Sequence, residues 1–275
     1  MKEKKHLKEK IKELLTENPY LSNREIGKLL NLSRGAIQWH IKSLGIHRDR
    51  KTLQKYNNTV RSKEIEISES AEQIILGSIL GDGSITKWVR GTDSKRNLNS
   101  HLVISHTEPQ LEYLLYKKHL LENARIKCQK VIKITKERLT KLCPEICGRS
   151  YTVKDRYTLA TRRAITFNKY RDMFYKKVKY VNRYIYKLKA LGLAIWFMDD
   201  GTKLHNTYSL STQCFDLKSL RLLQKVLFHN FNLDTTLNKA RTNQYNIYIK
   251  RKCADLFKQI IFPFICDSMK YKLYT

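Results

Sequence analysis

The sequence has no long apolar run. A helix needs about 18 consecutive apolar residues to cross a membrane, and no such stretch is present. The first five residues are mostly charged and no apolar segment follows them, so we expect no secretory signal. These two absences predict a protein without a membrane partner that works in the cytoplasm, or in an organellar matrix if its gene is organellar.

Standard zinc-ligand spacing is also missing. Among the six cysteines, Cys143 and Cys147 are separated by three residues and Cys128 lies nearby, but no pair of histidines at ligand spacing follows. In a reducing compartment such cysteines are expected to be mostly buried thiols. A zinc site is therefore the less favoured alternative.

Acidic residues are scarce relative to basic ones. The chain of 275 residues has 54 Lys and Arg against 25 Asp and Glu, a formal net charge of +29. Such a charge attracts polyanions, so nucleic acid is the first candidate partner and an anionic membrane surface is the second. Residues 1–69 carry +7 of this charge, and the remaining +22 is spread over many segments of the rest. That distribution favours a folded basic surface over a disordered basic tail.

The N-terminal residues have the pattern of three short helices. Apolar residues at helical spacing predict a first helix over 4–17, ended by Asn18-Pro19. A capping box at residues 22–25 begins a second helix, and Ser33 caps a third helix that runs to about Leu44. A short turn between the second and third helices is typical of a helix-turn-helix DNA-binding domain, which we place at residues 1–48.

The third predicted helix has two distinct faces. Ile37, Ile41 and Leu44 repeat at helical spacing and are expected to face the core. A different face is polar and basic, and it fits a DNA major groove. The alternative is a three-helix bundle with a solvated or protein-binding polar side. The candidate DNA-binding residues on this face are Arg34, Gln38 and Lys42.

Residues 49–70 are polar and basic and read as a linker, after which the chain is duplicated. Each half shows a helix, strands, a helix, strands and a helix, which describes an α+β fold with internal pseudo-twofold symmetry. We place the halves at about 71–180 and 181–275. The corresponding segments are 74–83 and 191–201, 101–105 and 208–212, 109–121 and 217–229, 151–161 and 245–250, and 167–175 and 256–264.

Each half begins with an apolar run that ends in Asp-Gly. The two runs are ILGSILGDG at residues 75–83 and LAIWFMDDG at residues 193–201. An Asp at the C-terminal end of a helix faces the negative end of the helix dipole, and a divalent cation would offset this. Two such helices packed side by side would bring Asp82 and Asp200 together. Paired carboxylates with divalent metal ions suit phosphodiester hydrolysis.

The residues within the two runs differ in size. Gly77, Ser78 and Gly81 are small, whereas the second run has the bulky side chains of residues 196–198. We expect small residues of one helix to face large residues of the other.

These two runs resemble the motif of the LAGLIDADG homing endonucleases, in the branch that carries two motifs in one chain. The C-terminal segments 262–265 and 268–273 resemble the same branch, so that the resemblance covers about residues 71–275. It implies two αββαββα-type halves and a monomeric enzyme. It further implies cleavage of both DNA strands with 3′ overhangs, using Mg²⁺ (or Mn²⁺), on a long double-stranded target site. No intein-like splicing sequence flanks the region, so we expect a free-standing or intron-encoded protein.

The resemblance implies two metal-binding catalytic acids, Asp82 and Asp200, with the backbone of Gly81 and Asp199 beside them. It also implies basic catalytic residues and polar residues that hold water. Lys250 matches the family's strand-end lysine best, and Lys203, which follows the second motif, is its rival. The water-positioning candidates are His106 and Gln213.

The resemblance also places a four-stranded sheet of each half in the DNA major groove. Polar and basic residues of the strands would then contact bases or phosphates. The candidates are Lys87, Arg90, Lys95, Arg96, Arg162, Arg163, Lys239, Arg241 and Lys250.

Two other functions fit the same fold. An RNA maturase that assists intron splicing would also need the +22 of the second region, with intron RNA as its partner. A transcription regulator could keep the fold without cleavage, although retention of both acids argues against a purely regulatory role.

Overall fold

The computed structural model describes residues 2–19, 21–48, 65–86, 99–142, 154–176 and 178–274. The chain divides into two compact units, Met1–Lys63 and Glu64–Thr275. Within the described ranges, no helix has the length and apolar character needed to span a membrane.

The N-terminal unit is a bundle of three helices: α1 (Lys2–Glu17), α2 (Asn23–Leu29) and α3 (Arg34–Ser43). Ser22 and Glu25 form the expected capping box at the start of α2, and Ser33 caps α3. A small apolar core holds the helices together. Its buried residues are Ile11, Leu15, Ile26, Ile37 and Ile41.

Helix α3 presents the two faces that its sequence predicts. Ile37 and Ile41 are buried in the core. The three candidate DNA-binding side chains, Arg34, Gln38 and Lys42, are exposed. The unit therefore offers a polar, basic helix face to a partner.

The second unit begins earlier than the sequence predicts. Residues 49–64 of the expected linker lie outside the described residues, but residues 65–70 belong to the fold. Ile65 and Ile67 pack against the main core, and Ser68 caps α5 (Glu69–Leu80). The difference arises because two isolated apolar residues carry no periodic signal, although they are enough to fasten the segment to the core.

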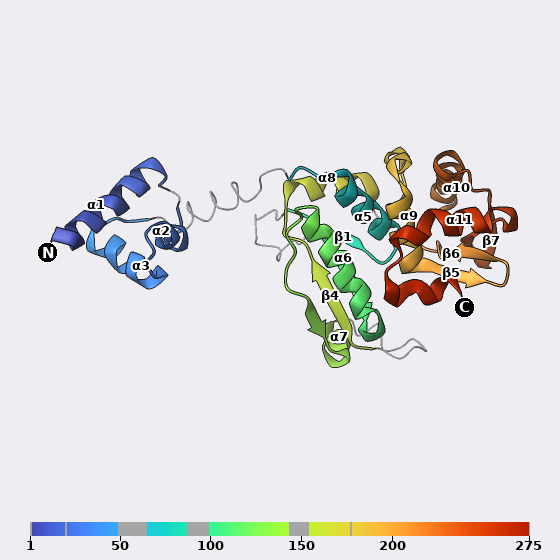
Figure 1. The fold of residues 1–275 in the computed structure, drawn as a ribbon, viewed down its shortest axis with the longest axis horizontal. Helices are drawn as coiled ribbons and strands as arrows, with labels where there is room; N and C mark the ends of the chain where they lie inside the picture. Colours follow the sequence, from blue (N-terminus) through green and yellow to red (C-terminus); the bar gives the residue numbers. More distant parts are fainter. Residues whose placement is uncertain are drawn as a thin grey trace. The chain divides into compact units, whose positions relative to one another are not determined.

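The first half of the second unit contains one antiparallel sheet with strand order β1-β2-β4-β3. Its helices lie beside that sheet (Figure 1). After α5, its elements are β1 (Ser84–Thr86), β2 (His101–Thr107), α6 (Leu111–Asn123), β3 (Ile132–Ile134), α7 (Lys136–Leu142), β4 (Arg156–Ala160) and α8 (Ile165–Phe174).

The second half repeats this architecture in a sheet with the equivalent order β5-β6-β8-β7. The α+β fold class with two similar halves is thus confirmed. The elements are the 3-10 helix η3 (Arg183–Lys187), then α9 (Ala190–Asp200), β5 (Gly201–Leu204), β6 (Thr207–Leu210), α10 (Leu217–Phe231), β7 (Thr235–Arg241), β8 (Gln244–Ile249), α11 (Ala254–Ile261) and the 3-10 helix η6 (Asp267–Leu273).

Strand register matches the two halves residue by residue. Directly after the motifs, Ser84 pairs with Val103 and Thr202 pairs with Ser209, so that Val103 and Ser209 are counterparts. The same offset relates the first residues of α6 and α10, Leu111 and Leu217. Counterparts across the pseudo-twofold can therefore be named along β2 and β6 and along α6 and α10.

The two motif helices, α5 and α9, pack against each other between the two sheets (Figure 1). A methyl group on Gly77 would clash with the carbonyl oxygen of Gly192 and approach Ile195, so these backbones touch. Gly77 thus faces the backbone of Gly192 and the side chain of Ile195, and not the bulky residues 196–198. The close approach of the two helix backbones leaves no room for a side chain at Gly77.

Candidate active site

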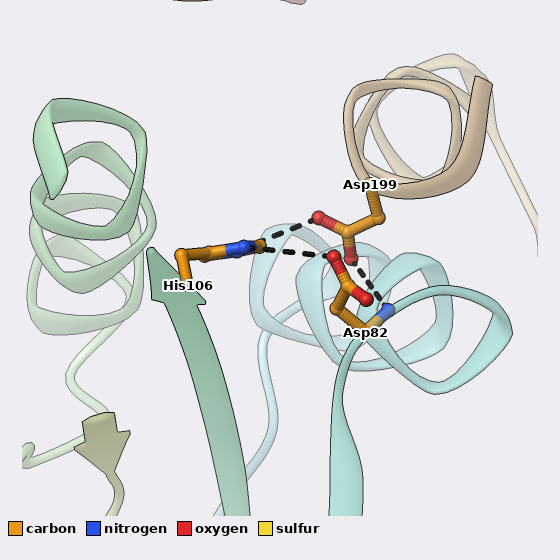
Figure 2. Close-up of side chains that lie close together, drawn as sticks. All are labelled: Asp82, His106 and Asp199. Atoms are coloured by element: carbon orange, nitrogen blue, oxygen red, sulfur yellow. Dashed lines mark hydrogen bonds and ion pairs between the residues drawn. The ribbon is translucent and has the colours of Figure 1, made fainter. Parts of the chain in front are cut away.

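The acids of the two motifs lie where α5 and α9 end. Asp82 lies two residues after the end of α5, while Asp199 and Asp200 are the last residues of α9. Figure 2 shows Asp82 and Asp199 pointing toward each other, with His106 of β2 approaching both from the side. The Asp82 side chain is 41% exposed, whereas those of His106 and Asp199 are almost fully buried. Asp82 therefore has a carboxylate available to a ligand.

His106 links the acids to a buried lysine. Its Nδ1 lies 3.5 Å from Asp82 Oδ2, and its Nε2 lies 3.3 Å from Lys117 Nζ. Burial, followed by the charge of Lys117, lowers the pKa of His106 to about 4, so the ring is neutral at pH 7. Because the Lys117 ammonium group donates a hydrogen bond to His106 Nε2, Nε2 is the acceptor and the ring proton is on Nδ1. Nδ1 is buried and has no hydrogen-bond partner in the described part of the chain, and it is directed at Asp82.

Asp199 is fully engaged by protein groups. Its Oδ1 accepts hydrogen bonds from Lys117 Nζ at 2.5 Å and from Tyr113 Oη at 2.8 Å. Its Oδ2 accepts the backbone N–H of Asp82 at 3.2 Å. Although Asp82, His106 and Asp199 each direct a potential ligand atom to one point, Asp199 has little capacity left for a metal ion.

Asp200 is coupled to the other acids by charge. Burial comes first, and repulsion by Asp82 and Asp199 second and third, among the causes that raise the pKa of Asp200 to about 7. Burial likewise raises the pKa of Asp82, with repulsion by Asp199 as the second cause. Carboxyl groups that disfavour ionisation in each other's presence form a site that favours added positive charge.

Two lysines provide part of that charge, at matching places in the two halves. Lys179 Nζ donates to the carbonyl oxygens of Gly81 and Gly83, each at 3.2 Å. Lys272 Nζ donates to the carbonyls of Met198 at 2.7 Å and Asp199 at 3.0 Å. Each ammonium therefore lies against the backbone that flanks one motif acid.

The sequence offers a signal for only one of these lysines. Lys272 lies within the C-terminal segment 268–273, whose resemblance to the family is visible, whereas Lys179 lies in a stretch without any motif. Burial lowers the pKa of both side chains, and the nearby acids oppose this effect. The positions of Lys179 and Lys272 beside the acids depend on contacts between residues that are distant in the sequence.

The two lysines that the sequence proposes as catalytic are not brought to the acids. Lys203 Nζ donates to the carbonyl oxygens of Leu204, at 2.5 Å, and His205, at 3.0 Å. Lys250 Nζ lies 4.0 Å from Asp234 Oδ2 at the far end of β8. Among the described residues, Lys117, Lys179 and Lys272 have the positions near the acids that were expected of Lys203 and Lys250.

The donor set fits a hard divalent cation. Asp82 and the partly buried Asp200 provide carboxylate oxygens, and the raised pKa of each reflects charge that a cation would offset. Mg²⁺ prefers such oxygen ligands and retains several waters. The buried, unpartnered His106 Nδ1 adds a polar atom that a held water can satisfy.

The remaining candidate residues lie on the surface of the second unit or outside the described residues. Gln213 is exposed between β6 and α10, one residue after Thr212, the counterpart of His106. Arg162, Lys239 and Arg241 are exposed. Arg163 is partly buried and donates to the carbonyl oxygen of Asn99 at 2.7 Å. The residues outside the described ranges are Lys87, Arg90, Lys95, Arg96, Cys143 and Cys147.

Comparison with protein families gives two matches. Residues 72–257 match the LAGLIDADG DNA endonuclease family, and residues 5–45 match a winged helix-turn-helix DNA-binding family. The first match includes both motif acids and the whole segment between them. The second includes all of α2 and α3.

Individual relatives agree with these matches. Over 210 residues the chain is 29% identical to the cytochrome b mRNA maturase bI2 of Saccharomyces cerevisiae, an alignment of 73% of this chain and 46% of the maturase. The chain thus spans about half the length of that relative. It is 31% identical over 146 residues to the intron-encoded endonuclease ai4 of Dictyostelium discoideum, covering 48% of this chain and 91% of that protein.

Among solved structures, the homing endonuclease I-WcaI, determined bound to its DNA recognition sequence, is similar to this chain. The superposition has a TM-score of 0.62 at 22% sequence identity, and it covers 84% of this chain and 96% of I-WcaI. At this identity the similarity establishes a shared fold.

Proposed function

Because the chain belongs to the LAGLIDADG DNA endonuclease family, we propose that it is a site-specific, intron-encoded endonuclease that cuts both strands of double-stranded DNA. The observation that carries this proposal is the pair of acids Asp82 and Asp200. They lie at the ends of two packed motif helices, and a lysine lies beside each motif. Burial raises the pKa of both acids, and the charge of Asp82 raises that of Asp200 further. Relatives named as intron-encoded endonucleases support it.

Divalent metal is the proposed cofactor, with Mg²⁺ or Mn²⁺ held by the carboxylates of Asp82 and Asp200. A bound divalent ion would supply Lewis-acid stabilisation of the charge that develops on phosphate oxygens during hydrolysis. Asp199 contributes no ligand in this proposal, because Lys117, Tyr113 and the Asp82 N–H already occupy its oxygens.

The neighbouring side chains have separate tasks. His106, neutral and with its proton on Nδ1, is placed to orient a water molecule beside Asp82. Lys179 and Lys272 bring positive charge to the two centres, where it stabilises the negatively charged phosphate of each strand. Burial keeps these charges effective, because solvent screens them less than it screens a surface lysine.

Recognition of the DNA is proposed to come from both units. The sheets of the second unit bind the target site, and the exposed face of α3 in the N-terminal unit adds a separate contact. Binding is expected to weaken as salt rises, by about 0.9 log units per log unit of salt for each phosphate contact on duplex DNA. An affinity that is nearly independent of salt would contradict this role for the basic surface.

One protein molecule is proposed to occupy one target site, because a single chain carries both halves of the catalytic unit. Analytical ultracentrifugation of the protein with a duplex target measures the stoichiometry. We expect a complex of one chain per duplex. Two chains on a single site would contradict the assignment.

The decisive experiment is a cleavage selection. The full-length protein is incubated with Mg²⁺ and a plasmid library that carries candidate intron-insertion sites, and the new DNA ends are sequenced. We expect linear products that share one long site, and their loss with EDTA. Cutting that persists with EDTA would refute the metal dependence, and ends scattered over unrelated sequences would refute the site specificity.

A maturase activity is the second candidate, favoured by the 29% identity to a cytochrome b mRNA maturase. The basic charge of the second unit suits RNA as well as DNA. A splicing assay with intron transcripts from candidate host genes tests it. Acceleration of splicing by the Asp82→Asn protein would separate this activity from cleavage.

A further inference from the structure

The matched halves differ most in the groups around Asp199. Asp199 occupies the seventh position of the second motif, and the seventh position of the first motif is Gly81. A side chain on Gly81 would clash with the Asp199 carboxylate. With Asp199 in this position, residue 81 has room only for a glycine, so the difference between the motifs has a steric cause.

The described groups that contact the Asp199 carboxylate come from the first half. Tyr113 and Lys117 lie on α6 and His106 lies on β2, and the side chains of Lys117 and Asp199 are completely buried. The Tyr113 hydroxyl oxygen also lies 3.1 Å from the carbonyl oxygen of Ile195 on α9. An acid that belongs to the second motif is thus held within the first half and bonded to the backbone of Asp82.

The second half has neutral residues at every counterpart position. Thr212 takes the place of His106, Ser219 that of Tyr113, and Leu223 that of Lys117. Thr212 donates to the carbonyl of Tyr245, and Ser219 accepts the N–H of Val181, so both are satisfied within their own half. Leu223 is fully buried in the apolar core. Among the residues that the structure describes, the charged cluster lies on one side of the pseudo-twofold only.

Resting on the nuclease function proposed above, we propose that Asp199 is a positioning residue for the Asp82 centre, and that it makes the two DNA strands unequal substrates. Through the Asp82 N–H it fixes the backbone of that acid. Through Lys117 it fixes the orientation of His106. In the described part of the chain the Asp200 centre has no equivalent support, so loss of Asp199 affects one strand more than the other.

The test compares variants of the full-length protein on a duplex target whose two strands carry different labels. Asp199→Asn removes the charge, and Asp199→Asn combined with Lys117→Met removes both buried charges in case the single variant fails to fold. Tyr113→Phe removes one hydrogen bond and keeps the ring. Leu223→Met is the matched control at the counterpart of Lys117.

We expect Asp199→Asn, and the double variant with it, to slow nicking of one strand about tenfold to a hundredfold, the usual effect of losing a group that orients a metal ligand. That strand should be the one nicked more slowly by Asp82→Asn. Tyr113→Phe should shift the ratio of strand rates in the same direction by a smaller factor, and Leu223→Met should leave it unchanged.

A measurement without cleavage accompanies this test. Mn²⁺ titration followed by electron paramagnetic resonance should show one weakened ion site in Asp199→Asn and an unaltered second site. Equal slowing of both strands, or equal weakening of both ion sites, would overturn the proposal and leave Asp199 as a purely structural residue. If the wild-type protein cut no DNA with any metal, the proposed function itself would fail, which is a different result.

Discussion

The two halves of the second unit have the same strand order but hold their motif acids in different ways. In the first half, Asp82 is surrounded by a buried cluster of charged and polar groups: His106, Lys117 and Asp199. In the second half, the counterparts of His106 and Lys117 are the neutral residues Thr212 and Leu223, and Asp200 has a pKa raised to about 7. Similar backbones can therefore hold their motif acids in unequal surroundings, because a few side-chain positions decide the local electrostatics.

The largest effect is expected when either motif acid, Asp82 or Asp200, is neutralised. Asp82→Asn and Asp200→Asn should each abolish double-strand cleavage, since each removes the carboxylate of one centre. Nicking and linearisation of plasmid, together with binding measured in EDTA, test this. Folding and most of the affinity for DNA should remain. Full cutting by either variant would disprove the roles of these acids.

Replacing Lys179 and Lys272 tests whether these matching lysines have the same role in the two halves. Lys179→Met and Lys272→Met should each slow cleavage about a hundredfold or more, as expected for loss of a preorganised charge at the reacting phosphate. Single-turnover rates on labelled duplex measure the effect. Lys203→Met and Lys250→Met are matched controls that also lose a charge. If these controls slowed cleavage more than Lys179→Met and Lys272→Met, Lys203 and Lys250 would be the basic catalytic residues, as the sequence predicts.

A smaller effect is expected in the N-terminal unit. Arg34→Ala or Gln38→Ala should weaken specific DNA binding by about 1–3 kcal/mol if the side chain contacts a base, while cleavage at saturating protein is retained. Competition binding with target and random duplex measures both. Lys12→Ala on α1 removes an exposed basic residue away from α3. If Lys12→Ala weakened DNA binding as much as Arg34→Ala, the unit would bind DNA by general electrostatic attraction and not by base contacts from α3.

The smallest expected effect is a pH-dependent change in Tm that follows from the raised pKa of Asp200. The folded-state pKa of Asp200, about 7, lies above its ordinary value of 3.8, so the folded state binds the proton more tightly than the unfolded state. The stability of the metal-free protein should therefore decrease as pH rises from about 4 through about 7. Asp200→Asn removes this penalty. It should raise Tm at pH 8 by about 2–4 °C, the shift that 1 kcal/mol produces in a domain of this size.

Thermal melts at pH 5 and pH 8 in EDTA measure this prediction. At pH 5 the folded-state carboxyl is still mostly protonated and only part of the stability loss has occurred, so the difference in Tm between the two proteins should be smaller than at pH 8. A rise of equal size at both pH values would mean that the substitution stabilises the fold by packing and not through charge.

The sequence alone determined the features that depend on local periodicity, which are the positions of helices and their buried and exposed faces. Helical spacing and capping residues located α1, α2 and α3 and predicted which face of α3 is exposed. Two apolar runs ending in Asp-Gly identified the motif helices, and with them Asp82 and Asp200. Local signals suffice there, because a helix is built from contacts between residues three and four positions apart.

Only the tertiary structure decided the surroundings of the acids. Lys117 meets Asp199 across 82 positions of sequence, and Lys179 meets Gly81 across 98. No periodicity connects such residues, since their meeting depends on how two helices and two sheets pack. For the same reason Asp199, a neighbour of Asp200 in the chain, is bonded to Asp82 in space: helix packing turns it toward the opposite half.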